Sequence, residues 1–311
     1  MTVLITGGAG FIGSHLCRAF LDRGDSVICV DNFITGSREN VKNLADNKNF
    51  KLIEHDISIP LYNINENIDW VLHFASLASP KDYITYPIKT LKSGLLGTHN
   101  CLGIAKAKKA KFFFASTSEV YGDPLIHPQT EEYWGNVNCI GIRSCYDESK
   151  RAGEALAYAY YRQHAIDIRV VRIFNTYGPN MQAEDGRVVS NFIVQALKGE
   201  DLTIYGKGNQ TRSFCYISDL VNGLLKMMQT DYKMPVNLGN PKEFTIKELA
   251  ELVLKFTKSK SKIKFMPLPE DDPKKRKPDI AKAEKLLKWQ PKISLEEGLE
   301  KTIEYFSAKL G

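Results

Sequence analysis

The chain has 311 residues, 43% of them apolar and 25% charged, which is the composition of a folded globular protein rather than a disordered chain. Its length allows one large domain or two smaller ones, and no apolar run is long enough to cross a membrane. The net charge of +6 comes without a basic stripe interleaved with aromatic residues, so we expect no nucleic-acid partner.

Six short apolar runs predict strands in the first part of the chain, and longer amphipathic stretches between them predict helices. The strand runs are VLIT (3–6), SVICV (26–30), FKLIE (50–54), WVLHF (70–74), KFFFAS (111–116) and DIRVVRIF (167–174). Helical patterns between them include FIGSHLCRAFLDRG and PIKTLKSGLLGTHNCLGIAKAKK. Such alternation predicts a parallel sheet covered by helices on both faces, which is the doubly wound, Rossmann-type α/β architecture.

After Gly178 the pattern changes to longer loops and separate helices, which indicates a smaller second unit. DDPKKRKPDI (271–280) predicts a charged loop before one helix, and SLEEGLEKTIEYFSAK predicts another. The latter opens with Ser294 and Glu297 in capping-box spacing, and its apolar positions share one face: Leu295, Leu299, Ile303 and Phe306. We expect a dinucleotide-binding domain of residues 1–177 and 215–239, and a discontinuous α/β substrate-binding domain of residues 178–214 and 240–311.

The segment VLITGGAGFIGSHL places glycines between a predicted strand and a predicted helix. Gly7, Gly10 and Gly13 allow a tight turn and a close approach of the backbone to a pyrophosphate at the helix N-terminus. The next strand run is followed by Asp31, whose carboxylate can accept hydrogen bonds from a ribose 2′-hydroxyl and would repel a 2′-phosphate. The glycine loop and Asp31 together favour NAD over NADP. The alternative is that the glycines form a purely structural turn and Asp31 is an ordinary residue at a strand end.

A hydroxyl-rich stretch, STSEVYG (116–122), follows the fifth strand run, and YDESK (146–150) comes about thirty residues later. Tyr146 and Lys150 are four residues apart and share a helix face. We expect the ammonium and the nicotinamide charge to lower the pKa of the phenol, so that it can remove a hydroxyl proton. Thr117, at the carboxyl end of its strand, can bond the same substrate oxygen. A lone Y-x-x-x-K is usually only a solvated helix face.

The six cysteines and six histidines are scattered without the spacing of metal ligands, so we expect no metal site. Several cysteines lie inside apolar runs, which favours a reduced, cytoplasmic setting. Met1 leads within two residues into a predicted strand, so we expect no signal peptide and no membrane association.

Many short motifs along the chain, read together, resemble one group of enzymes. They are GGAGFIGSHL, DNFITGSREN, HDISIPLY, YPIKTLK, STSEVYGDP, HPQTEEYWGNVN, CYDESKR, RIFNTYGP, DGRVVSNFI, QTRSF, NLGNP and DDPKKRKPDI. These motifs are similar to those of the UDP-glucuronate decarboxylases, or UDP-xylose synthases, within the extended short-chain dehydrogenase/reductase family. They run from residue 1 to the neighbourhood of residue 290 and therefore cover nearly the whole chain.

The resemblance implies NAD-dependent decarboxylation of UDP-glucuronate to UDP-xylose through a transient 4-keto sugar, with NAD regenerated in each cycle. Related 4,6-dehydratases carry an Asp-Glu pair where this chain has Ser118 and Glu119. Dehydration needs a proton donor for the departing hydroxyl, whereas CO₂ leaves without one, so Ser118 argues against dehydration. The alternatives are a 4-epimerase or 4,6-dehydratase of another nucleotide sugar, a decarboxylase that releases the UDP-4-keto-pentose, and a catalytically silent NAD-binding module.

The resemblance also assigns residues to roles. The catalytic set is Tyr146, Lys150, Thr117, Ser118, Glu119 and Arg276. The cofactor set is Gly7, Gly10, Phe11, Ile12, Gly13, Asp31, Asn32, Phe33, Thr35, Gly36, Asp56, Ile57, Phe74, Ala75, Ser76, Ala115, Ser116, Tyr146, Lys150 and Thr176. The substrate set is Leu61, Tyr62, Lys92, Asn175, Arg187, Val188, Tyr205, Arg212 and Arg276.

Residues 88–107 and the helix after Lys150 resemble the helices that form a four-helix seam in this family, so a homodimer is expected. The chain departs from the family's usual pattern at a few positions. Leu77 and Ile142 stand where proline is usual, Ser149 where glycine is usual, and Gly94 where asparagine or a similar residue is typical. These changes concern local shape more than the type of reaction.

Overall fold

A seven-stranded parallel sheet is the centre of the computed structural model, which describes residues 1–267 and 275–310. In spatial order its strands are β11 (Val236–Leu238), β6 (Ile168–Ile173), β5 (Lys111–Thr117), β4 (Trp70–His73), β1 (Thr2–Thr6), β2 (Ser26–Asp31) and β3 (Phe50–Glu54). Every neighbouring pair is parallel. The predicted Rossmann-type sheet is confirmed, and the six predicted strand runs agree with β1 to β6 to within one residue at each end.

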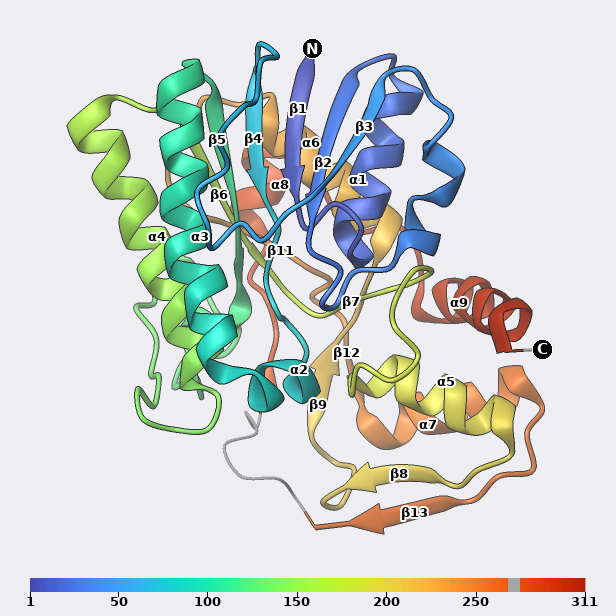
Figure 1. Cartoon of the computed structure of the whole chain (residues 1–311). Helices are drawn as coiled ribbons and strands as arrows, with labels where there is room; N and C mark the ends of the chain where they lie inside the picture. Colours follow the sequence, from blue (N-terminus) through green and yellow to red (C-terminus); the bar gives the residue numbers. More distant parts are fainter. Residues whose placement is uncertain (268–274, 311) are drawn as a thin grey trace.

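Helices cover both faces of the sheet, because alternate strand residues point to opposite sides. Val3 and Ile5 pack in the core that contains α1 (Phe11–Asp22) and α6 (Ile217–Met228). Leu4, between them, packs in the separate core beneath α3 (Pro87–Lys108) and α4 (Ser144–His164). Figure 1 shows α3 and α4 side by side along one flank of the sheet.

A smaller group of elements lies below the carboxyl ends of the strands (Figure 1). It contains α5 (Val188–Lys198), β8 (Leu202–Tyr205), β9 (Thr211–Ser213), β12 (Glu243–Thr245), α7 (Ile246–Thr257), β13 (Ile263–Met266), β14 (Lys275–Arg276) and α9 (Leu295–Leu310). Strand β8 pairs with β13, and β9 lies between β12 and β14. All four residues of the apolar stripe predicted for α9 are buried, and the Glu297 amide donates to Ser294 Oγ as expected for the cap.

The remaining elements are short. They are η1 (Arg38–Asn40), η2 (Lys42–Leu44), α2 (Pro80–Thr85), η3 (Ser118–Tyr121), β7 (Thr176–Tyr177), β10 (Cys215–Tyr216) and α8 (Ala281–Leu287). Helix α8 packs against α6 and β11 at the sheet, although its residues belong to the range expected for the smaller domain. The domain division therefore stays a prediction.

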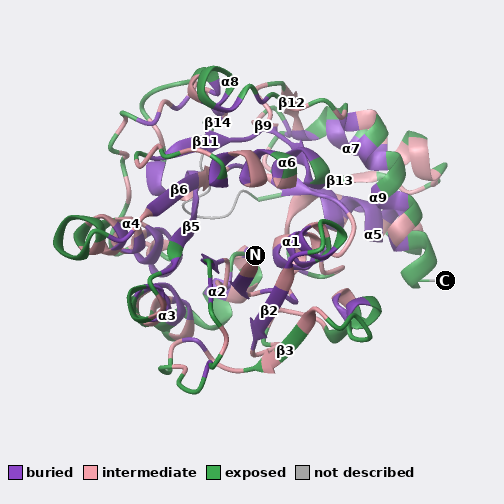
Figure 2. Ribbon diagram, turned by 90° about the horizontal axis from the view of Figure 1, so that it is seen from above, coloured by how far each residue is buried: buried purple, intermediate pink, exposed green. Residues whose placement is uncertain are grey.

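Part of the charged loop expected at residues 271–280 lies outside the described residues. Within residues 1–267 and 275–310, none of the helices combines the length and apolar character that a membrane span requires. Figure 2 shows buried residues concentrated in the sheet and on the inward faces of the helices, with exposed residues on the outward faces of α3 and α4.

Candidate active site

A cavity of about 590 Å³ lies at the carboxyl ends of β1, β2, β4 and β5, where the strand order reverses between β1 and β4. Ligands of open α/β sheets bind at such a reversal point. Residues of α5, β8 and β9 and the side chain of Arg276 close the opposite wall. The volume is of the size that holds small ligands in proteins.

The glycine loop shapes one end of this cavity. Gly7 has a φ of +70° and lies so near Ala75 that a Cβ there would come within 2.7 Å of the Ala75 amide nitrogen. A Cβ on Gly13 would clash with the carbonyl oxygen of Gly7. Gly10 is the N-cap of α1 and supplies no side-chain cap, so the first amides of the helix remain available to an anion. The chain therefore presents a phosphate-sized cradle at a helix N-terminus.

Asp31 lies at the end of β2, beside this loop. Its Oδ2 accepts a hydrogen bond from the Ala9 amide at 2.9 Å, and its Oδ1 accepts one from the Phe33 amide at 2.9 Å. Burial raises the pKa of the carboxyl group, although these backbone donors oppose the rise. Asp31 thus braces the glycine loop and also faces the cavity, where a ribose hydroxyl can reach it.

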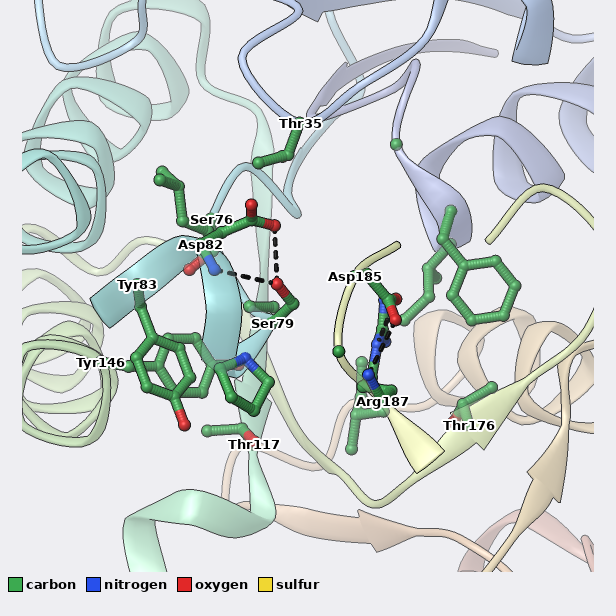
Figure 3. Close-up of a pocket in the computed structure, with 18 of the residues that line it drawn as sticks. Thr35, Ser76, Ser79, Asp82, Tyr83, Thr117, Tyr146, Thr176, Asp185 and Arg187 are labelled. Atoms are coloured by element: carbon green, nitrogen blue, oxygen red, sulfur yellow. Dashed lines mark hydrogen bonds and ion pairs between the residues drawn. The ribbon is translucent and has the colours of Figure 1, made fainter. Parts of the chain in front are cut away.

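Tyr146 and Lys150 lie on α4 and both line the cavity. Figure 3 shows Tyr146 beside Thr117. Lys150 Nζ donates to the Ala115 carbonyl at 2.8 Å and lies 5.8 Å from the centre of the Tyr146 ring. The Tyr146 hydroxyl forms a hydrogen bond with the Thr117 side chain, so the two groups that we expect to bind the substrate oxygen lie together.

The chain's own groups do not lower the pKa of Tyr146, and the part expected from the nicotinamide charge stays a prediction. Burial raises the pKa of the phenol, and this outweighs the hydrogen bond from Thr117. Burial also lowers the pKa of Lys150 to about 8, so the ammonium itself is only partly retained above neutral pH. A phenolate here requires further positive charge, and the oxidised nicotinamide ring is a charge of that kind.

Glu119 lines the cavity and lies between two arginines. Its Oε2 is 2.5 Å from Arg143 Nη2 and 3.1 Å from Arg276 Nη2. Burial alone would raise the pKa of Glu119, but Arg276 and Arg143 outweigh it and hold the pKa at about 2. Glu119 is therefore ionised at neutral pH and cannot donate a proton.

Arg276, which contacts Glu119, belongs to strand β14 in the smaller group of elements. Strand β14 pairs in parallel with β9, which places Arg276 opposite Arg212. The Arg276 side chain is 2% exposed and donates from Nη1 to the Ser118 carbonyl at 2.8 Å. Residues more than 150 positions apart in the sequence thus meet at one carboxylate.

The far wall carries a second ion pair (Figure 3). Arg187 Nε donates to Asp185 Oδ2 at 2.7 Å, and Asp185 is almost fully buried. The Arg187 guanidinium also lies 5.6 Å from the centre of the Phe11 ring, which brings the far wall beside the glycine loop. A guanidinium held in this way is suited to phosphate oxygens.

Most of the residues assigned from the sequence line this one cavity. They are Gly7, Gly10, Phe11, Ile12, Gly13, Asp31, Asn32, Thr35, Ile57, Phe74, Ala75, Ser76, Ala115, Ser116, Thr117, Ser118, Glu119, Tyr146, Lys150, Asn175, Thr176, Arg187, Val188, Tyr205, Arg212 and Arg276. Six assigned residues are not part of its wall: Phe33, Gly36, Asp56, Leu61, Tyr62 and Lys92. Tyr62 is 75% exposed, Lys92 is on the outward side of α3, and Asp56 pairs with Lys89.

Sequence reasoning left several cavity residues unassigned, among them Tyr83 on α2 and Arg143 at the N-cap of α4. The Tyr83 ring stacks on the Tyr146 ring with centroids 5.4 Å apart and planes 8° apart (Figure 3). The Arg143 guanidinium lies 5.6 Å from the centre of the Tyr83 ring. Ser79, which caps α2 by accepting from the Asp82 amide, could have indicated a helix at the sheet's carboxyl edge. No pattern singled out Arg143.

The comparisons with known proteins all match enzymes that act on nucleotide sugars. The family model described as GDP-mannose 4,6 dehydratase matches residues 4–302. UDP-glucuronic acid decarboxylase 1 of Danio rerio is 55% identical over 308 residues, or 99% of this chain and 73% of that protein. UDP-glucuronic acid decarboxylase 6 of Arabidopsis thaliana is 53% identical over 312 residues, or 100% of this chain and 90% of that protein.

A solved structure extends the likeness to three dimensions. It is the crystal structure of UDP-glucuronic acid 4-epimerase from Bacillus cereus in complex with UDP-glucuronic acid and NAD. It superposes with a TM-score of 0.88 at 29% identity and covers all of both chains.

Proposed function

The chain belongs to the nucleotide-sugar enzymes of the extended short-chain dehydrogenase/reductase family that the GDP-mannose 4,6 dehydratase model describes, and we propose that it decarboxylates UDP-glucuronate to UDP-xylose with bound NAD. The observation that carries the proposal is Glu119 held ionised by Arg143 and Arg276 beside Ser118. Neither Ser118 nor ionised Glu119 can act as the acid that a dehydratase carries at this pair of positions to protonate the departing C6 hydroxyl. Identity above 50% to UDP-glucuronic acid decarboxylases over almost the whole chain supports the same reaction.

The glycine loop, the α1 N-terminus and Asp31 would hold NAD, since they offer a phosphate cradle and a ribose acceptor in one cavity. Bound NAD supplies the hydride acceptor for C4 and later returns the hydride, so it acts as a catalyst and not as a consumed substrate. Lys150, fixed to the Ala115 carbonyl, would orient the nearby ribose and add positive charge beside Tyr146.

Tyr146 would take the proton of the C4 hydroxyl, with Thr117 bonded to the same oxygen. The resulting 4-keto sugar carries its C6 carboxylate β to the ketone. When the bond from C5 to C6 breaks, the electron pair moves into the C4 carbonyl and CO₂ leaves. The Tyr146 and Thr117 hydroxyls would stabilise the enolate oxygen that forms there. A proton added at C5 and reduction at C4 complete UDP-xylose.

Glu119 would keep the substrate carboxylate from binding tightly to the two arginines. An arginine that held this carboxylate alone would stabilise the charge that decarboxylation must move into the ring. Because Glu119 already pairs with both guanidiniums, the substrate carboxylate meets about half of their combined positive charge. Arg187, Arg212 and Asn175 line the cavity where the diphosphate and nucleotide would extend.

We also propose that the chain forms a homodimer. Helices α3 and α4 pack against each other on one face of the sheet and expose several apolar side chains. Ile88 and Leu96, eight residues apart on α3, are 69% and 47% exposed, and Tyr161 on α4 is 38% exposed. A second copy that packs the same two helices would bury these residues in a four-helix seam.

The test is product analysis with UDP-glucuronate and the purified chain. We expect CO₂ and UDP-xylose, with UDP-glucose as a control that yields neither. An epimerised UDP-sugar with the carboxylate retained, or a 4-keto-6-deoxy sugar, would contradict the proposal. Release of UDP-4-keto-pentose together with reduced cofactor would keep the decarboxylation and correct only the final step.

A further inference from the structure

Decarboxylation consumes a proton, and the groups around Tyr146 determine which one can supply it. This inference rests on the proposed function. When CO₂ leaves a carboxylate, the carbon left behind must gain one proton from outside the substrate in every turnover. Tyr146 is not a net source, because the proton that it takes from the C4 hydroxyl returns to the same oxygen when the ketone is reduced.

The charged groups at the sugar end do not supply this proton either. Glu119 is ionised between Arg143 and Arg276, which hold its pKa at about 2. Guanidinium groups do not release protons at physiological pH. The source must therefore be another group that reaches the same end of the cavity.

Asp147 is next to Tyr146 in the first turn of α4, and its carboxyl group has no part in the proposed steps at C4. It is 6% exposed, and its Oδ1 is buried with no hydrogen-bond partner among the described residues. An ionised carboxylate in this condition is costly, whereas a protonated one is not. Burial, together with the smaller effect of the Glu119 charge, raises the pKa of Asp147 to about 7.

The groups that act on Asp147 come from four elements. Arg143, Cys145, Tyr146 and Glu148 belong to α4 and its N-cap, Glu119 to η3, Arg276 to β14 and Tyr83 to α2. Glu119 and Glu148 favour the protonated form of Asp147, and Arg143 and Arg276 oppose it. The opposing arginines are themselves paired with Glu119, which limits their effect.

Two more buried polar atoms of this group also have no partner among the described residues, the Tyr83 hydroxyl and Arg143 Nε. Buried polar atoms are almost always hydrogen-bonded, and an internal water is the usual partner where protein groups do not reach. Tyr83 and Arg143 line the cavity, and Asp147, which does not line it, is close enough to interact electrostatically with both. These three side chains therefore define a polar route from a buried carboxyl group to the substrate.

The geometry points to Asp147 as a proton-relay residue that supplies C5 along the route lined by Tyr83 and Arg143. The O–H bond of the Asp147 carboxyl group breaks, and its proton passes through internal water to C5. The enolate electron pair forms the new C5–H bond and restores the C4 ketone. Asp147 remains as a carboxylate and takes the next proton from solvent.

The test is Asp147→Asn in the full-length enzyme, with CO₂ release followed from about pH 5.5 to about pH 9. In the wild type we expect kcat to fall above about pH 7, as Asp147 loses its proton. The variant should lose this pH dependence and should turn over at least about tenfold more slowly. Slow protonation at C5 delays the final reduction, so the near-ultraviolet absorbance of reduced cofactor should increase during steady state. A purely structural role would not move these two readouts.

Glu148→Gln is the matched control, since it removes a neighbouring carboxylate that pairs with Arg151 on the partly exposed side of α4. It should keep the kcat of the low-pH plateau and move the pH limb only slightly to lower pH, because Glu148 raises the Asp147 pKa less than burial and Glu119 do. Asp147→Glu should restore part of the pH-dependent limb. An Asp147→Asn enzyme with an unchanged pH profile and kcat within about twofold of the wild type would overturn the relay.

A second measurement uses only the wild type, so it tests the relay even if the Asp147→Asn variant does not fold. Infrared spectra of the wild type labelled with carbon-13 at its aspartate carboxyl groups should contain a protonated carboxyl band at about pH 6 that disappears by about pH 8. Absence of that band would overturn the relay. Failure of the proposed function is a separate result, because the wild type would then release no CO₂ at any pH.

Discussion

At the residue scale, Tyr146 is set apart by contacts on three sides: Thr117 at its hydroxyl, Tyr83 on its ring and Lys150 below. We predict that Tyr146→Phe lowers kcat on the order of a thousandfold, because the C4 hydroxyl loses its proton acceptor. The phenyl ring keeps the stack on Tyr83, so UDP affinity measured by calorimetry should stay within about threefold. Turnover close to that of the wild type would support a binding module instead of an enzyme.

The charge on Glu119 makes the free energy of unfolding depend on pH. Its pKa is lowered from 4.5 to about 2 in the folded chain, so below pH 4.5 the unfolded chain binds a proton that the folded chain does not. The stabilisation is present above pH 4.5 and is lost as the pH falls toward 2. We predict that Glu119→Gln lowers the free energy of unfolding at pH 7 by about 3 kcal/mol, since two buried guanidiniums lose their partner.

Urea unfolding at about pH 7, pH 4.5 and pH 3 would check this prediction. The difference in unfolding free energy between wild type and Glu119→Gln should be largest at neutral pH and should shrink as the wild-type carboxylate becomes protonated. A difference that stays constant over this range would mean that Glu119 is not held ionised by its arginines.

At the element scale, α3 and α4 approach closely at Gly94 and Ser149, two positions where the sequence departs from the usual family pattern. A Cβ on Gly94 would come within 2.5 Å of Ser149 Cβ. The serine side chain therefore fills the space that the glycine leaves. We interpret the two departures as a compensating pair, which the sequence alone did not indicate because the positions lie in different helices.

We predict that Gly94→Ala destabilises the chain by about 1–2 kcal/mol, although alanine is the better helix former by about 1 kcal/mol. Ser149→Gly should remove the clash, so the double variant should be more stable than the sum of the single effects by about 1–2 kcal/mol. Thermal or urea unfolding of the four chains measures this coupling. Additive effects within about 0.5 kcal/mol would exclude direct packing between the two positions.

At the scale of the whole molecule, the elements that local periodicity dictates could be predicted from the sequence. Strands β1 to β6, helix α1 and helix α9 have apolar patterns that match their buried faces. The site depends more on pairing between distant segments. Arg276 reaches Glu119 because β14 pairs with β9. Apart from the family resemblance, nothing in the charged run around Arg276 indicated this contact. The effect of burial, which raises the pKa of Tyr146, could not be predicted, because helix spacing indicates proximity to Lys150 but not the degree of burial.

The exposed apolar residues of α3 and α4 lead to a prediction about dimerisation. Leu96 is on the exposed side of α3 in the same stripe as Ile88, at the centre of the expected seam. A charge buried there by a second copy would be unpaired, so Leu96→Glu should convert a dimer into monomers in light scattering after size-exclusion chromatography. Leu286→Glu is the matched control, because Leu286 is 38% exposed on α8, which packs on α6 and β11 away from α3. A Leu96→Glu chain that keeps twice the mass of one chain would place the interface elsewhere, and a wild-type monomer would remove the proposed seam altogether.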